Sequence, residues 1–199
     1  MTASSPELWL LRHGATAWAN SGRHTGRTDI PLLPEGEQQA RALAPLLASQ
    51  TFAAVLVSPL ERARRTCALA GLGEGALVDD DLREWDYGAY EGITTAEIRQ
   101  TVPDWTVWTH PCPDGESRLQ VQERCERLIQ RCLALAGAGE RVALFAHGHL
   151  LRSLAGTWLG LGAGGGALLA LGTGTYSVLG QEREQRVLLR WNAPVALPA

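Results

Sequence analysis

The sequence contains no lysine, and the 18 residues in its lysine and arginine total are all arginine. A protein without lysine cannot form a lysine Schiff base, and it lacks the phosphate-binding lysine of a Walker A loop. Positive charge is not in excess either, since the formal net charge is −3 at pH 7. This balance creates no field that would attract nucleic acid or an acidic membrane surface, so neither is expected as a partner.

Long apolar runs and paired cysteines are also missing. The stretch 150–171 comes nearest to the roughly 18 apolar residues of a membrane span, but Arg152 and several glycines interrupt it. The first seven residues lack the basic patch and apolar core of a secretory signal, which favours a reducing, cytoplasmic location. The cysteines show neither a Cys-X-X-Cys pair nor zinc-like spacing with histidine and are interpreted as buried free thiols. They are Cys67, Cys112, Cys125 and Cys132.

Short apolar runs alternate with helical patterns along the 199 residues, a length that suits one packed domain. Each run is bounded by turn signals, which indicates a buried strand. Strands are expected at 8–11, 53–57 and 141–146, with two more, as a hairpin, at 175–179 and 186–191. Helices are expected at 34–48, 58–70, 94–101, 117–135 and 148–159. Residues 15–34 and 81–92 are expected to be irregular, and 103–115 to run over the surface. The alternation predicts an α/β domain with a largely parallel sheet.

Residues that bind anions or move protons follow the three clearest strands. Arg12 and His13 follow the first strand, and His147 follows the third. Ser58 follows the second, with Arg62 one helical turn later. Ligands of open α/β sheets bind at the carboxyl ends of the strands, where helix starts add backbone donors. Because a guanidinium group offers a planar fork of donors to phosphate, neighbouring strands would build a phosphate pocket here.

A histidine directly beside an arginine suits nucleophilic attack on phosphorus. Neutral imidazole attacks through one nitrogen while the other donates a hydrogen bond, and nearby arginines would disfavour protonation of His13. His147, beside a phosphate dianion, is expected to be protonated and to stabilise the transferring oxygens. The leaving alkoxide needs a proton from a carboxyl group, for which Glu84 is favoured, with Asp86 and Glu91 as competitors.

Several short blocks, taken in order, resemble the histidine phosphatase (phosphoglycerate mutase-like) family. They are Leu11-Arg12-His13-Gly14, Thr25-Gly26 with Asp29-Ile30-Pro31-Leu32, Ser58-Pro59-Leu60-Glu61-Arg62, Leu82-Arg83-Glu84 with Tyr87-Gly88, Gly115-Glu116-Ser117 and His147-Gly148. The similarity extends from about residue 8 to residue 160. It implies a three-layer α/β/α sandwich around a mostly parallel sheet, with no metal and no organic cofactor. It also implies a single domain over residues 1–199, with an inserted, lid-like segment at about 85–115.

The resemblance assigns roles by block position. His13 would be the nucleophile, Glu84 the acid and base, and Arg12, Arg62 and His147 the groups that hold the phosphoryl. The substrate-binding residues implied are Arg12, Thr25, Gly26, Arg62, Tyr87, His147 and Gly148. A small phosphorylated metabolite is the expected partner, and a homodimer is left open.

The chain departs from the mutases of this family at three positions. Ala19 replaces an asparagine that binds phosphate, and Trp85 and Asp86 replace basic residues that grip the substrate carboxylate. Whether Asn20 or Arg152 contacts phosphate stays open. With fewer cations to retain a bisphosphate intermediate, water should complete the reaction, which favours a phosphatase.

The run from 83 to 92 looks most similar to the sedoheptulose bisphosphatase branch, whose substrates are sugar bisphosphates. The alternatives are a phosphoglycerate mutase and a non-catalytic phosphate-binding protein.

Overall fold

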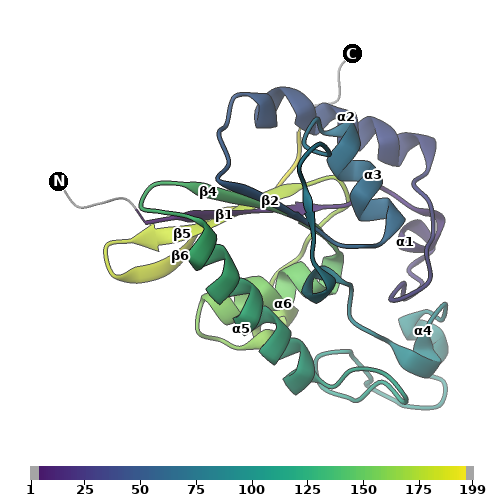
Figure 1. Cartoon of the computed structure of the whole chain (residues 1–199). Coiled ribbons are helices and arrows are strands. Elements are labelled where there is room, and N and C mark those ends of the chain that lie inside the picture. The colour runs from purple at the N-terminus through teal and green to yellow at the C-terminus, as the bar shows by residue number, and fades with distance from the viewer. Residues whose placement is uncertain (1–4, 196–199) are drawn as a thin grey trace.

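In the computed structural model, which describes residues 5–195, a six-stranded sheet lies between two layers of helices (Figure 1). The predicted three-layer α/β/α sandwich is confirmed. Residues 1–4 and 196–199 lie outside the described range. They include most of the stretch considered for a secretory signal and both ends of the predicted domain.

The strands follow the order β3-β2-β4-β1-β5-β6 across the sheet. They are β1 (Glu7–Arg12), β2 (Ala54–Val57), β3 (Leu77–Val78), β4 (Arg141–Ala146), β5 (Tyr176–Glu182) and β6 (Gln185–Ala193). The first four are parallel to one another, whereas β5 pairs antiparallel with β1 and forms the predicted hairpin with β6. Strand β3 was not predicted, because two residues are too few to leave a pattern.

The helices agree with the expected ranges where their apolar stripes are long. They are α1 (Ala17–Ser21), α2 (Pro34–Ala48), α3 (Glu61–Leu69), α4 (Thr95–Ile98), α5 (Arg118–Leu135) and α6 (Gly148–Trp158), with 3₁₀ turns η1 (Asp80–Leu82), η2 (Gly88–Tyr90) and η3 (Ala163–Leu168). Helix α1 lies in a region predicted to be irregular, and α4 is shorter than predicted. Both begin at a threonine whose side chain caps the first turn, and neither has room for an apolar stripe.

Helix α3 begins three residues later than predicted from Ser58-Pro59. Leu60 occupies the N-cap position and makes no side-chain cap. The carboxylate of Asp29, from a distant loop, instead accepts the N–H of Glu61 at 2.8 Å. Ser58 is therefore not the N-cap of α3, and its hydroxyl lies 2.8 Å from the Nε2 of His147.

Both faces of the sheet are buried, which explains why its central strands are continuous apolar runs. Leu8 and Leu10 of β1 pack in the cluster between the sheet and helices α5 and α6. Trp9 and Leu11 point to the opposite face and pack in the cluster with Leu43, on α2. Figure 1 shows α2 and α3 above the sheet and α5 and α6 below it.

The aromatic residues of the predicted lid-like segment belong to the core. Trp85, Tyr87 and Trp105 are each 1% exposed and pack in the cluster on the α5 and α6 side of the sheet. The expectation that residues 103–115 only run over the surface is therefore wrong for Trp105. Gly88 and Gly115 bring the two ends of the segment together, since a Cβ at Gly88 would lie 2.4 Å from the nitrogen of Gly115.

Candidate active site

Three parallel strands deliver the predicted residues to one edge of the sheet. Strand β4 lies between β1 and β2, with Arg12 paired to Ala146 and Val57 paired to Phe145. His13, Ser58 and His147 come directly after these strands, so all three stand at the same carboxyl edge. The His13 and His147 rings have centroids 5.2 Å apart.

A pocket of about 270 Å³ opens at this edge. It is lined by Arg12, His13, Ala19, Gly22, Arg23, His24, Thr25, Glu84, Tyr87, Thr95, Gly148, His149, Arg152 and Leu171. Six of the predicted catalytic or binding residues line this pocket, together with others that the motifs did not single out. Arg23, Thr95 and Leu171 carry no sequence signal for this place, because only the folded chain brings them there.

His13 is held in the tautomer that nucleophilic attack requires. Its Nδ1 lies 2.8 Å from the carbonyl oxygen of Gly14, to which it donates, so Nε2 keeps its lone pair. Burial lowers the pKa of His13 well below its ordinary value of 6.5, and the charges of Arg12 and Arg62 lower it further. The ring is therefore neutral near pH 7.

The loop after His13 is fixed by close packing. The N–H of Gly14 donates to Oγ1 of Thr66 on α3 at 3.1 Å. A Cβ on Gly14 would lie 2.1 Å from the carbonyl oxygen of Gly36, at the start of α2. Only glycine allows the loop after His13 to approach the start of α2 this closely. The contact holds in place the Gly14 carbonyl, which accepts the hydrogen bond from His13.

Glu84 lies in the pocket wall with its carboxylate at the N-terminus of α6. Its Oε1 accepts the N–H groups of Trp85 at 2.9 Å and Leu150 at 2.8 Å, and its Oε2 accepts the N–H of His149 at 3.0 Å. Each carboxylate oxygen has about two acceptor positions. Oε2 therefore has one position left toward the pocket, and it is the atom suited to carry a proton.

The rival carboxylates are engaged elsewhere. Asp86 forms an ion pair with Arg27 at 2.7 Å. Glu91 accepts the N–H groups of Gly26 and Thr28. Neither carboxylate lines the pocket described above, which leaves Glu84 as the carboxylate at the site.

Arg12 presents an unused donor at the site. Within residues 5–195 its buried Nε has no hydrogen-bond partner, while Nη1 donates to the carbonyl of Leu171. Gly148 makes room for this guanidinium, because a Cβ there would lie 3.2 Å from the Cζ of Arg12. A buried, charged donor without an acceptor suits an anionic ligand.

Arg62 and His147 lie behind the pocket and do not line it. Both are fully buried, and the Nε of Arg62 donates to Nδ1 of His147 at 3.1 Å. The ring proton of His147 is therefore on Nε2, which donates to Ser58. Burial, and next Arg62, lower the pKa of His147 well below 6.5. Arg62 donates to the nitrogen that protonation would require, so His147 is neutral in this structure. That His147 becomes protonated beside a phosphate dianion stays a prediction.

Arg62 also anchors the loop at residues 25–28. Its Nη atoms donate to the carbonyls of Thr25, Gly26 and Thr28 at 2.9–3.0 Å. Since the N–H of Gly26 is taken by Glu91 and its carbonyl by Arg62, the structure does not bring Gly26 to the pocket as a substrate contact. Thr25, at the edge of the same loop, does line it.

Aromatic and imidazole rings form the rim. The hydroxyl of Tyr87 lies 2.6 Å from Nδ1 of His149, and the ring of His24 packs 4.7 Å from that of Tyr87. Burial lowers the pKa of His24 to about 4 and holds that of His149 well below 6.5. Burial raises the pKa of Tyr87 well above 10, and Glu84 adds to this. The rim is therefore neutral and hydrogen-bonded around pH 7.

The sequence left open whether Asn20 or Arg152 contacts phosphate, and the structure places these two side chains differently. Arg152 lines the pocket, lies over the ring of Trp108 at 4.7 Å and donates from Nε to the carbonyl of Gly166. Asn20 instead donates to Glu35 at 2.6 Å and is not part of the pocket lining.

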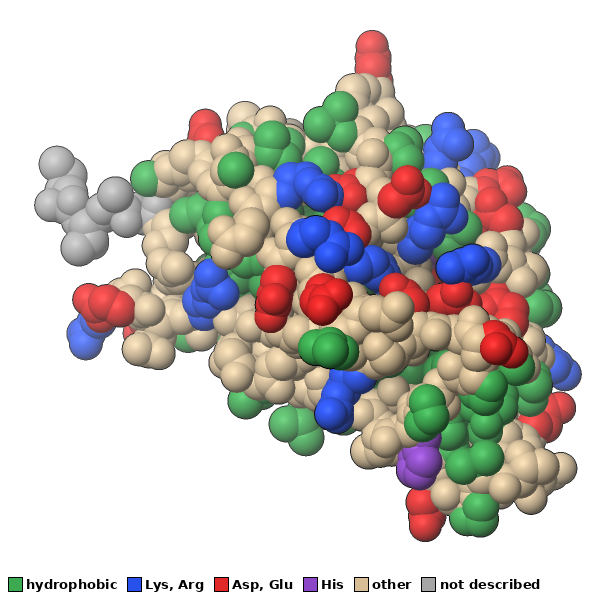
Figure 2. Space-filling model, turned by 60° about the horizontal axis from the view of Figure 1, so that its bottom comes forward, with side chains coloured by type: hydrophobic (Ala, Val, Ile, Leu, Met, Phe, Trp, Pro, Cys, Tyr) green, Lys and Arg blue, Asp and Glu red, His purple; other side chains and the backbone are tan. Residues whose placement is uncertain are grey.

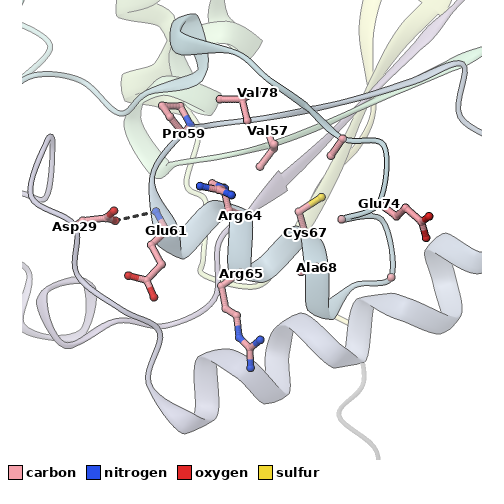
Figure 3. Close-up of a pocket in the computed structure, with 13 residues that line it drawn as sticks. Asp29, Val57, Pro59, Glu61, Arg64, Arg65, Cys67, Ala68, Glu74 and Val78 are labelled. Carbon is pink, nitrogen blue, oxygen red and sulfur yellow. Dashed lines mark hydrogen bonds between the residues drawn. The ribbon is translucent and has the colours of Figure 1, made fainter.

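A larger cavity, of about 690 Å³, lies beside α3 and is distinct from this pocket (Figure 3). It contains Arg64, Arg65 and Cys67, and it has no histidine in its wall. Figure 3 shows the Asp29 carboxylate reaching the start of α3 at its rim. Arg64 and Arg65 are both exposed there, and Arg65 pairs with Glu37.

Within residues 5–195, no helix is both long and apolar enough to cross a membrane. No group of three or more histidine, cysteine, aspartate or glutamate side chains in that range is placed to hold a metal ion.

The fold and the pocket together define the class, an α/β protein with histidine and arginine at the carboxyl edge of its sheet. The chain belongs to the histidine phosphatase superfamily (branch 1), whose family model matches residues 8–194. It is 41% identical to an acid phosphatase of Mycobacterium tuberculosis, over 94% of this chain and 93% of that protein. It is 36% identical to the sedoheptulose 1,7-bisphosphatase of Saccharomyces cerevisiae, over 81% and 70% respectively. A solved structure of a Mycobacterium tuberculosis open reading frame matches with a TM-score of 0.90 and 38% identity, covering 96% and 98% of the two chains.

These matches confirm the family resemblance drawn from the short blocks. The protein is accordingly an enzyme, a phosphatase of the histidine phosphatase superfamily.

Proposed function

We propose that this protein hydrolyses phosphomonoesters of small metabolites, sugar phosphates or bisphosphates, through a phosphohistidine on His13 and without a metal ion. The observation that carries the proposal is the state of His13. Its Nδ1 donates to the Gly14 carbonyl, which leaves a neutral Nε2 at a pocket that also holds Arg12 and Glu84. Nucleophile, cation and carboxyl group are the three parts that phosphoryl transfer to an imidazole needs.

The reaction would proceed in two steps. In the first, Nε2 of His13 bonds to phosphorus as the ester P–O bond breaks, and Oε2 of Glu84 gives its proton to the leaving alkoxide. In the second, Glu84 takes a proton from water, whose oxygen attacks phosphorus and releases His13 with inorganic phosphate. Arg12, with its unpartnered Nε, would hold the phosphoryl oxygens through both steps. Arg62 and His147 would contribute from behind His13.

The charges around the pocket support a substrate with two anionic groups. Besides Arg12, the lining includes Arg23, from the segment after α1, and Arg152, from α6. A phosphate placed at His13 would leave these two arginines for a second phosphate or a carboxylate. The similarity to a sedoheptulose 1,7-bisphosphatase supports the sugar bisphosphate class.

The mutase alternative is less well supported. Ala19 lines the pocket where the mutases have a phosphate-binding asparagine. Trp85 is buried in the core, and Asp86 is paired with Arg27, so neither position presents a cation to the pocket. A bisphosphate intermediate would have fewer positive groups to retain it, and water would reach the phosphohistidine first.

The test of this proposal is phosphate release in the presence of a chelator. The panel would contain sugar mono- and bisphosphates, phosphoglycerates and an aryl phosphate. We expect turnover of at least one compound to survive chelation, with the bisphosphates fastest. Isomerisation of phosphoglycerate without net release would establish a mutase, and loss of all turnover with the chelator would contradict a metal-independent reaction.

The lowered pKa of His13 makes a further prediction about pH. A histidine with the ordinary pKa of 6.5 would be about 90% protonated at pH 5.5, and kcat/KM would fall about tenfold between pH 7.5 and 5.5. Because burial and two arginines keep His13 neutral below pH 6.5, its nucleophilic form should persist from pH 7.5 to pH 5.5. We expect kcat/KM, corrected for ionisation of the phosphate ester, to change less than about twofold. A tenfold fall with an apparent pKa near 6.5 would show that His13 is not shielded.

A further inference from the structure

The segment that carries Glu84 has little regular structure of its own. The η1 turn ends at Leu82 and η2 begins only at Gly88. A general acid must nonetheless be held close to its productive position, since small misplacements are costly to rate. Two charged side chains from outside the segment, Arg124 and Glu116, supply its missing hydrogen bonds.

Arg124, on α5, binds the carbonyl groups around Glu84. Its Nη1 donates to the carbonyls of Asp81 at 2.7 Å and Arg83 at 2.8 Å. Its Nη2 lies 3.4 Å from the carbonyl of Glu84 itself. The Arg124 residue is 9% exposed, so these bonds form with little competition from water.

Glu116 completes the arrangement from the other side. Its carboxylate accepts Nε of Arg124 at 2.8 Å and Nη2 at 2.7 Å, a two-point ion pair. The same carboxylate accepts the N–H of Asp86 at 2.9 Å, and the Glu116 N–H donates to the Asp86 carbonyl. The indole of Trp85 donates to the Glu116 carbonyl at 3.0 Å. Backbone groups on both sides of Glu84 are thus bound by one partly buried ion pair.

We infer that the Arg124–Glu116 ion pair, which we call the clamp, positions Glu84 for proton transfer while contacting neither substrate nor reacting atoms. Neither member belongs to the pocket lining described above; both face the far side of Glu84, beside Asp86 and Arg83. This role rests on the proposed function of Glu84 as acid and base. It adds two positioning residues to the N–H groups of α6 that bind the Glu84 carboxylate.

The same helix offers a matched control. Arg127 forms an ion pair with the Asp81 carboxylate at 2.7 Å and is half exposed. Figure 2 shows a face of the molecule on which acidic and basic side chains are interspersed. Arg127 therefore holds the η1 turn by a side chain at the surface but does not bind the backbone at residues 83–86. Loss of Arg127 should weaken general packing of the turn without moving Glu84.

The first measurement does not depend on activity. Amide hydrogen exchange would be compared between the wild type and the Arg124→Gln, Glu116→Gln and Arg127→Gln variants. The N–H groups of Trp85, His149 and Leu150 report on Glu84, because they donate to its carboxylate. We expect their exchange to rise about tenfold or more in the two clamp variants and to stay near the wild-type rate in Arg127→Gln. Equal protection in all variants would overturn the clamp, whatever reaction the protein catalyses.

The second measurement separates positioning from general damage. Single-turnover phosphorylation of His13 would be followed with an alkyl phosphate, whose leaving group needs a proton, and with dinitrophenyl phosphate, whose leaving group does not. Arg124→Gln should slow the alkyl ester about 10²-fold and the aryl ester less than about threefold. Adding Glu84→Gln to Arg124→Gln should slow the alkyl ester no further than Glu84→Gln alone, because both act through one group.

The outcomes are distinguishable. Equal slowing of both esters, or additive losses in the double variant, would show a purely structural ion pair. Glu116→Gln keeps an acceptor for Arg124 and provides the same test if Arg124→Gln folds poorly. Arg124→Lys should restore only part of the alkyl ester rate, because an ammonium group cannot reproduce the fork that reaches several carbonyls. If no ester phosphorylates wild-type His13, the proposed function fails, while hydrogen exchange still decides the clamp.

Discussion

The His13→Ala variant is expected to lose phosphatase activity by a factor of about 10⁴ or more, with no covalent phosphoenzyme left. Among the histidines of residues 5–195, His13 is the one whose Nδ1 is fixed by a carbonyl while Nε2 stays available at the pocket. Alanine leaves Arg12 and Glu84 in place, so binding of the phosphate group should persist. The loss should therefore fall on kcat far more than on KM.

Labelled substrate and a denaturing quench at alkaline pH would trap the intermediate in this experiment. A phosphoramidate on imidazole is labile in acid and stable in alkali, so a brief quench and an alkaline gel would show it in the wild type and not in His13→Ala. His110→Ala is the matched control, because the His110 side chain bonds to Thr109 in its own loop and does not line the pocket. A labelled His13→Ala protein would place the phosphoryl group on another residue and refute the assignment.

The central strands and their terminal residues could be predicted because the signals are local. Each of β1, β2 and β4 is a short apolar run that ends directly before a polar residue, and a parallel sheet brings such ends together. The choice of Glu84 over Asp86 was harder, since both carboxylates stand in one short stretch. The structure separates them by partner: Asp86 meets Arg27, and Glu84 meets the N-terminus of α6.

The parts that the sequence did not predict are long-range. Nothing near Arg124 indicates that it binds carbonyls of residues about 40 positions earlier. Ser58-Pro59 has the form of a helix start, yet the cap comes from Asp29, and Ser58 serves His147 instead. A single sequence shows a side chain's local options, and tertiary contacts decide which one is used. The neutral state of His147 is a further case, since it depends on a hydrogen bond from Arg62.

Arg62→Gln is expected to be the most destabilising substitution among the residues at the site. Arg62 is fully buried and donates to His147 and to three carbonyls of the 25–28 loop. Each buried acceptor that loses its donor costs about 1–3 kcal/mol, so the free energy of unfolding should fall by roughly 3 kcal/mol or more. For a chain of this length that corresponds to a fall in Tm of about 6–12 °C.

The same variant should also lose activity, because the two consequences share one cause. Without the Nε donor, Nδ1 of His147 loses the bond that fixes its tautomer, and Thr25 loses its anchor at the pocket edge. Arg65→Gln on the same helix is the control, since its surface pair with Glu37 should matter by no more than about 0.5 kcal/mol. Thermal unfolding followed by circular dichroism, with kcat and KM measured well below Tm, would test both effects. If Arg62→Gln had the same Tm as Arg65→Gln and kept its kcat, Arg62 would be needed neither for stability nor for activity. If Arg62→Gln lowered Tm and left kcat unchanged, the role of Arg62 would be confined to holding the 25–28 loop. Loss of both would tie the loop and His147 to the same guanidinium, as its four hydrogen bonds require.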